Sequence, residues 1–233
     1  MPLVASSISA NLERIRNQMA EACTKAGRSP ASVALMAVSK MHPAEAILEA
    51  SEAGQRLFGE NRVQEAQAKA QILGLEGLDL HLIGPLQNNK TSKAAELFHA
   101  VDTLDSLKTA ERLNSAALAL NKRLAVLVEV KLSPEETKHG LAPQELPALL
   151  AALAPLPHLD VRGLMTVPPW SEDPETVRPF FQQLRRLRDE NLAAYPTLTE
   201  LSMGMSNDFA VAIEEGSTCV RIGTAIFGKR IYS

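Results

Sequence analysis

The feature that most constrains the fold is a regular alternation of apolar, strand-like segments with amphipathic, helix-like segments along the whole chain. The strand-like segments are 33–38, 56–59, 79–84, 99–102, 124–130, 161–167, 199–203 and 219–223. Between them we expect helices at 44–53, 62–73, 88–97, 106–120, 143–154, 175–194 and 207–215. An additional N-terminal helix, ending near Gly27, is indicated by apolar residues at helical spacing. This alternation predicts one domain, residues 1–233, folded as an α/β (β/α)8 TIM-type barrel.

Composition limits the kind of ligand. The chain carries a net charge of −3, and 22% of its residues are charged. No block of basic residues interleaves with aromatic ones, so nothing indicates binding to nucleic acid or to an anionic membrane. Its five histidines are scattered without metal-ligand spacing. We therefore expect a small soluble ligand.

Cysteine usage and the N-terminus indicate a location. Cys23 and Cys219 lie far apart and form no CxxC pair, which argues against a disulfide scaffold or a cysteine zinc site. Residues 1–20 are too polar for a signal peptide, and no apolar window is long enough to span a membrane. A cytoplasmic protein is expected.

Lys40 closes the segment 33–40, whose apolar run 33–38 has the pattern of a strand covered on both faces. Pro43 then opens the next helical segment, so Lys40 sits at a βα junction. Lysines that form Schiff bases with carbonyl groups occupy such positions in barrels. The alternative is a solvated ammonium without a role, which is the common state of lysine.

Two later segments carry groups suited to an anion. Barrels of this type commonly hold phosphate in the loops after the seventh and eighth strands. In 201–208, Gly204 allows close approach of the backbone, and Ser206 or Asn207 can cap the next helix and leave N–H groups facing an anion. An ordinary helix cap explains this segment equally well.

The second segment, 220–228, places Arg221 inside an apolar strand, with Gly223 and Thr224 directly after it. A buried guanidinium must have a partner, because burying it unpaired costs several kcal/mol. The partner is either a ligand or a barrel carboxylate such as Glu129. The pattern alone leaves both open.

Six motifs occur in one order along the chain. They are Ala37-Val38-Ser39-Lys40, Phe58-Gly59-Glu60-Asn61, the segment 81–90, Gly163-Leu164-Met165-Thr166, the segment 201–206 and the segment 220–228. With these motifs the chain resembles the pyridoxal phosphate homeostasis proteins, which are similar to the barrel domain of alanine racemases and belong to the fold type III pyridoxal phosphate (PLP) proteins. Arg62 stands where that family usually has tyrosine, which changes the polarity of this rim position.

The resemblance implies a site for pyridoxal 5'-phosphate formed by Lys40, Asn61, Met205, Ser206, Arg221, Gly223 and Thr224. Lys40 would form the Schiff base with the cofactor aldehyde. Ser206, Gly223 and Thr224, with the backbone near Met205, would hold the phosphate. Asn61 would line the ring pocket.

Arg221 would face the pyridine nitrogen in this arrangement. Because its guanidinium stays protonated, it disfavours a protonated pyridinium and leaves the ring a weak electron sink. We also expect partial burial and the nearby Arg221 to lower the pKa of Lys40, since only the neutral amine attacks an aldehyde.

A racemase needs acid/base groups on opposite faces of the cofactor. In alanine racemases the opposing tyrosine comes from a second domain, whereas this chain ends at Ser233 and has only Tyr195 and Tyr232, neither well placed. We therefore expect a monomeric carrier or buffer in PLP homeostasis without turnover, with PLP-dependent apo-enzymes as possible recipients. A PLP-dependent racemase or other PLP enzyme, a cofactor-free Schiff-base aldolase and a structural interaction module are the alternatives.

Overall fold

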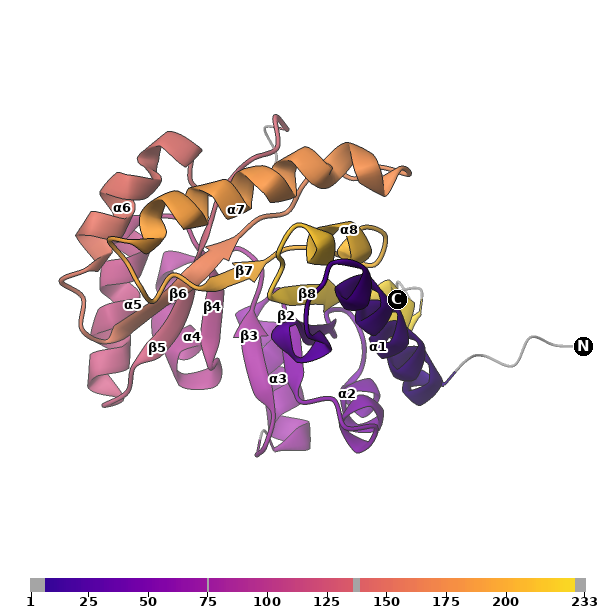
Figure 1. The fold of residues 1–233 in the computed structure, drawn as a ribbon. Helices are drawn as coiled ribbons and strands as arrows, with labels where there is room; N and C mark the ends of the chain where they lie inside the picture. The colour runs from indigo at the N-terminus through magenta and orange to yellow at the C-terminus, as the bar shows by residue number, and fades with distance from the viewer. Residues whose placement is uncertain (1–6, 75, 136–138, 229–233) are drawn as a thin grey trace, which may run out of the picture.

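Parallel strands form the centre of the molecule. In the computed structural model, eight strands close into a barrel within the described residues 7–74, 76–135 and 139–228, and they follow one another around it in sequence order (Figure 1). The strands are β1 (Ala34–Val38), β2 (Leu57–Glu60), β3 (Asp79–Leu82), β4 (Ala100–Leu104), β5 (Leu124–Glu129), β6 (Leu159–Met165), β7 (Glu200–Ser202) and β8 (Cys219–Ile222). Pairing of β1 with β8 completes the ring. The predicted fold class is confirmed.

Helices surround this barrel (Figure 1). They are α1 (Ile8–Lys25), α2 (Ala44–Glu52), α3 (Val63–Leu73), α4 (Thr91–Leu97), α5 (Leu107–Ala119), α6 (Leu146–Leu153), α7 (Arg178–Leu192), α8 (Phe209–Glu214) and α9 (Thr224–Phe227). Short 3-10 turns occupy Pro30–Ser32, Asn88–Lys90, Pro143–Glu145 and Pro174–Val177. The predicted helix 175–194 therefore starts as a 3-10 turn, because Pro174 and Pro179 each lack the N–H that a helix interior needs.

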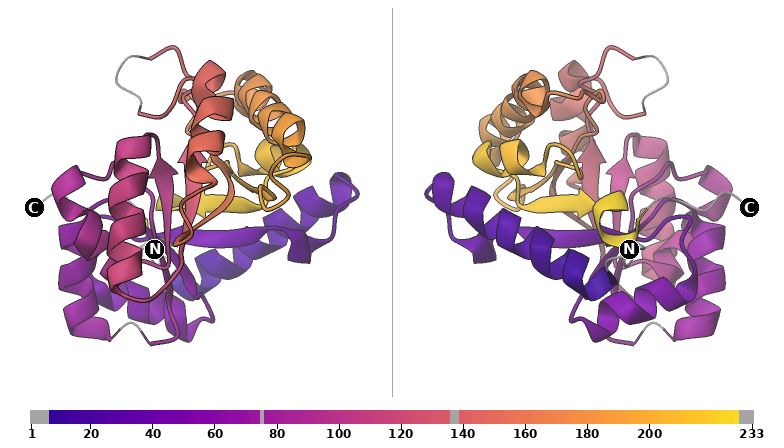
Figure 2. Two further views of the ribbon diagram at one scale, coloured as in Figure 1. Left: turned by 90° about the vertical axis from the view of Figure 1, so that its left-hand side faces the viewer. Right: turned by 90° about the vertical axis from the view of Figure 1, so that its right-hand side faces the viewer.

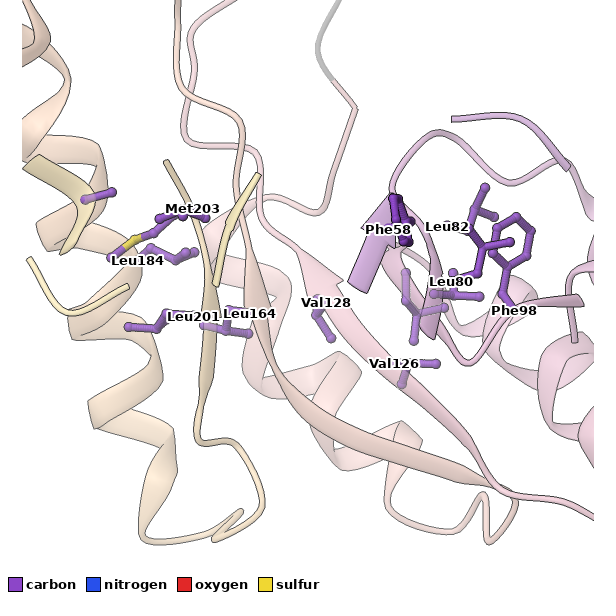
Figure 3. Close-up of a cluster of buried hydrophobic side chains, with 14 of the residues drawn as sticks. Phe58, Leu80, Leu82, Phe98, Val126, Val128, Leu164, Leu184, Leu201 and Met203 are labelled. Carbon is purple, nitrogen blue, oxygen red and sulfur yellow. The ribbon is translucent and has the colours of Figure 1, made fainter. Parts of the chain in front are cut away.

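The strands are apolar because both of their faces are covered. Every residue of β4 and β5 is buried, so these strands show no alternation of polar and apolar residues. Figure 3 shows the packing on the outer side, where Leu184 of α7 lies beside Leu201 of β7 and Met203. Phe58 and Phe98, both fully buried, fill another part of the same core.

Helix α1 supports the end of the chain that follows β8. It packs against α8 and α9, and the two views in Figure 2 show it along the outside of the strands. The Asn11 amide donates a hydrogen bond to the carbonyl of Ile226 (2.9 Å), and Arg14 donates one to the carbonyl of Ala225 (3.0 Å). The N-terminal helix thereby fixes the segment that begins at Thr224.

One ion pair lies among the strands. The Nδ1 atom of His81 is 3.1 Å from Oδ1 of the fully buried Asp102, and its Nε2 atom is 3.3 Å from Asp79. Burial favours the neutral imidazole, but the two carboxylates outweigh it and raise the pKa of His81 to about 10. His81 is therefore charged at neutral pH.

Within the part of the chain that the structure describes, no helix has the length and apolarity to cross a bilayer.

Candidate functional site

A cavity of about 470 Å³ opens where the strands reach their carboxyl ends. The structure brings all seven residues of the expected cofactor site to its wall: Lys40, Asn61, Met205, Ser206, Arg221, Gly223 and Thr224. They come from the ends of β1, β2, β7 and β8. Parallel strands place these ends at one edge, which is why residues far apart in sequence meet here.

Lys40 lies two residues beyond β1, on the cavity wall. Its side chain is half-buried, whereas the preceding Ser39 is fully buried. The N–H of Ser39 donates to the carbonyl of Gly59, so the pairing of β1 with β2 continues to the residue before the lysine. The amine is therefore carried on a backbone that the sheet still holds.

Asn61 enters the wall directly after β2. The loop after β3 presses against it, since a Cβ atom on Gly84 would overlap the backbone oxygen of Asn61. Glycine at this position lets Gly84 and Pro85 form the neighbouring part of the wall. Arg62, the departure from the family pattern, is exposed.

Arg221 is buried in β8 and also lines the cavity. Its Nη1 donates to the Ser202 hydroxyl and its Nη2 to the Thr166 carbonyl, both at 2.8 Å. Among the described residues, no oxygen of Glu129 lies within ion-pair distance of it. The expected alternative of an ion pair with Glu129 is therefore wrong, and neutral acceptors from the ends of β6 and β7 hold the guanidinium instead.

Glu129 nevertheless belongs to the site, at the end of β5. Burial raises the pKa of its carboxyl to about 7, although the positive charge of Arg221 acts in the opposite direction. The cavity thus contains a carboxyl group that titrates near neutral pH. The signal for this residue in the sequence is a glutamate inside the apolar run 124–130, a pattern that predicts a partner for Arg221 and not a titrating group of the site.

The loop after β7 turns sharply to reach α8. Gly204 has φ +99°, and a Cβ atom there would come within 2.6 Å of the Ala212 Cβ. The N-cap of α8 is Asp208, not Ser206 or Asn207 as the sequence suggested, and Asp208 Oδ1 accepts the Met205 N–H at 2.6 Å. The helix starts later because this carboxylate closes the turn.

Two loops then offer polar groups to the cavity. Ser206 and Thr224 contribute hydroxyls, and Gly223 contributes backbone. Over the described ranges, the backbone N–H groups of Ser206, Gly223 and Thr224 donate to no other part of the protein. Unpaired N–H and O–H donors around one space form a cradle suited to a phosphate.

Further residues of the wall were not predicted as site residues. His139 comes from the loop after β5. Trp170 lies at the rim with 72% of its surface exposed. The side-chain amide of Asn207, in the loop after β7, donates a hydrogen bond to the carbonyl of Ser171 (2.8 Å) and so links that loop to the segment after Trp170. A single tryptophan in a loop carries no positional signal in the sequence.

Comparisons with solved structures agree with this architecture. PipY of Synechococcus elongatus PCC7942, solved with PLP bound, is 43% identical, with a TM-score of 0.86 over 95% of this chain and all of that chain. Alanine racemase of Clostridium difficile 630 is 16% identical, with a TM-score of 0.74, and the match covers 96% of this chain and 58% of that one. At that identity, the likeness to the racemase shows a shared barrel fold alone.

Sequence comparisons identify the family. Residues 10–231 match the family described as alanine racemase, N-terminal domain. The pyridoxal phosphate homeostasis protein of Vibrio cholerae is 47% identical over 97% of this chain and 98% of its own length. The protein of the same name from Escherichia coli K12 is 46% identical over 98% and 99%. Since relatives of that name match it over almost its whole length, this chain belongs to the pyridoxal phosphate homeostasis protein family.

Proposed function

We propose that this protein binds pyridoxal 5'-phosphate in the cavity, holds it as a Schiff base on Lys40 and serves as a carrier or buffer of the cofactor. One observation supports this above all: the amine of Lys40, the unpaired donors of Ser206, Gly223 and Thr224, and the buried Arg221 line the same cavity. These groups match an aldehyde, a phosphate and an aromatic ring nitrogen. PipY, of the same fold and 43% identical, binds PLP.

Each group has a separate task in this proposal. The cofactor supplies an aldehyde and a conjugated ring. Lys40 provides the nucleophile, while the N–H and hydroxyl donors bind the phosphate oxygens by hydrogen bonds. Arg221 remains protonated and directs its charge at the ring nitrogen, which opposes protonation of the ring. A ring kept neutral withdraws electrons weakly, so storage is favoured over turnover.

A PLP-dependent racemase or other PLP enzyme is the second candidate. Glu129, with a pKa of about 7, and His139 both line the cavity and could move protons there. Against a racemase, no tyrosine lines the cavity among the described residues, and Tyr195 packs against the hydrophobic core. Tyr232 lies outside the described residues. We therefore favour the carrier.

The setting of the carrier follows from the same features. Cys23 and Cys219 are free and buried, which is consistent with the reducing cytosol. PLP-dependent apo-enzymes there are the proposed recipients.

The deciding experiment is an absorbance spectrum with PLP, followed by borohydride reduction and peptide mapping. Wild type should show a Schiff-base band and a reduced adduct on Lys40, and Lys40→Ala should show neither. Lys108→Ala, which removes an exposed lysine of α5, is the control and should behave as wild type. An adduct at another lysine would refute the site. Hydrogen exchange at the α-carbon of added amino acids, lost in Lys40→Ala, would favour the racemase instead.

A further inference from the structure

Two side chains of α3 hold the two peptide groups that flank Lys40. Lys69 Nζ donates a hydrogen bond to the carbonyl oxygen of Ser39 at 2.8 Å. Glu65 Oε1 accepts the N–H of Met41 at 2.5 Å. The first group belongs to the peptide bond before Lys40 and the second to the peptide bond after it. The backbone on both sides of the lysine is thus tied to one helix.

The same two side chains belong to a largely buried cluster, in which Glu65 is the partly exposed member. Lys69 Nζ also donates to Glu60 Oε1 (2.6 Å) and Glu65 Oε1 (2.8 Å), and the Ser39 hydroxyl donates to Glu60 Oε1 (2.6 Å). An ammonium has three N–H donors, so these contacts use all the donors of Lys69. Lys69 is therefore committed to the cluster and is no candidate for the Schiff base itself.

The backbone next to Lys40 has an uncommon conformation. Met41 has φ +62°, in the left-handed region that residues other than glycine seldom adopt. Its side chain is 45% exposed, so side-chain burial contributes little to holding this conformation. The His42 N–H closes the turn by donating to the Ser39 carbonyl (3.1 Å), and the bond to Glu65 is the side-chain contact that holds the Met41 N–H. A change of φ at Met41 would redirect the chain directly after Lys40.

We propose that Glu65 and Lys69 are positioning residues, which hold the turn 39–41 so that Lys40 reaches the cofactor aldehyde. This inference rests on the proposed function. Neither residue lines the cavity, so they act on the amine through the backbone of Lys40 and not by contact with the ligand.

The step that depends on this positioning is the capture of the aldehyde. The lone pair of the neutral Lys40 Nζ attacks the aldehyde carbon and forms a C–N bond. The carbonyl oxygen then leaves as water with the two amine protons, and no oxidant or reductant is needed. Since the attack depends on distance and angle, a misplacement of about 1 Å slows such a step by roughly a hundredfold.

Glu65→Ala removes the acceptor of the Met41 N–H, whereas Glu65→Gln keeps an acceptor oxygen at that position. Two quantities are measured well below the melting temperature. One is the rate at which the Schiff-base band appears with PLP. The other is the affinity for pyridoxine 5'-phosphate, which carries an alcohol in place of the aldehyde and cannot be captured covalently. Glu52→Ala, on the exposed face of α2, controls for loss of a helix carboxylate.

We expect Glu65→Ala to slow capture by roughly ten- to a hundredfold while the affinity for pyridoxine 5'-phosphate changes by less than about twofold. Glu65→Gln should recover most of the rate, and Glu52→Ala should match wild type. Lys69→Met should slow capture as well, but it also leaves Glu60 buried without a cation, which is strongly destabilising. The Glu65 variants are therefore the ones that test the proposal.

Two outcomes would overturn the positioning role. In one, Glu65→Ala captures PLP at the wild-type rate. In the other, it loses affinity for pyridoxine 5'-phosphate as strongly as it loses rate, which would mean that Glu65 supports the whole pocket. Failure of the proposed function looks different, because wild type itself would then form no adduct on Lys40.

Discussion

The guanidinium of Arg221 lies 2.8 Å from the hydroxyl of Ser202, to which its Nη1 donates. The two residues belong to neighbouring strands, β8 and β7. A second bond, from Nη2 to the Thr166 carbonyl, prevents rotation of the planar group. A positive charge is thereby fixed at the wall of the cavity by two neutral hydrogen-bond acceptors.

Replacing Arg221 should destabilise the fold. Arg221→Met would leave the Thr166 carbonyl and the Ser202 hydroxyl without their donor, at an expected loss of about 2 to 4 kcal/mol in the free energy of unfolding, measured by urea denaturation. Arg162→Met, which removes an exposed arginine paired with Asp160, should cost less than about 1 kcal/mol. Equal losses in both variants would contradict the role assigned to the two buried bonds.

Glu129 should make stability depend on pH near neutrality. Its pKa of about 7 in the folded protein lies above the ordinary value of 4.5, so the folded state binds the proton more tightly. The stabilising contribution is fully present below pH 4.5 and is lost as the pH rises through 7.

Glu129→Gln stays neutral and should therefore gain stability relative to wild type between pH 5 and pH 8, by roughly 1 to 3 kcal/mol. Urea denaturation at the two pH values measures this difference. Glu111→Gln, on the exposed face of α5, controls for loss of a carboxylate. A constant difference between Glu129→Gln and wild type would show that burial does not raise this pKa.

The pair of His81 and Asp102 should lose its effect at high pH. The pKa of His81 rises from 6.5 to about 10 in the folded protein, so its contribution is fully present below pH 6.5 and disappears as the pH rises through 10. His81→Gln should therefore be clearly less stable than wild type at pH 7, and this deficit should shrink at pH 10.5. Thermal unfolding at both pH values tests the expectation, and a deficit that stays the same would refute it.

Gly204 should tolerate no side chain. Gly204→Ala combines a left-handed φ of +99° with a clash against Ala212, and we expect a loss of about 2 to 4 kcal/mol in stability. Gly27→Ala is the matched control, since Gly27 also has positive φ (+66°) but open space around its Cβ position. That variant should lose only about 1 kcal/mol. If the two losses are equal, the close approach of the Gly204 loop to α8 does not matter.

The barrel could be predicted from the order of segments along the chain. Strands covered on both faces have continuous apolar runs in their sequences, and the helices between them carry an apolar stripe. The alternation could therefore be recognised from short stretches of sequence. The residues at which the strands begin and end were harder to predict. The segment expected at 161–167 is β6, Leu159–Met165, because Leu159 and Asp160 pair with Leu124 and Ala125 of β5. Such pairing depends on a partner that the local pattern does not contain.

The seven expected site residues were implied by the family resemblance that the ordered motifs carry, and the closed barrel brings them to one cavity. The groups that surround these residues could not be predicted in this way and are known from the folded structure. The bonds from Glu65 and Lys69 to the backbone around Lys40, and the burial that shifts the pKa of Glu129, follow from the distance between side chains that are remote along the chain. Hydrogen bonds and desolvation act over a few ångströms in space, and spacing in the sequence does not encode them.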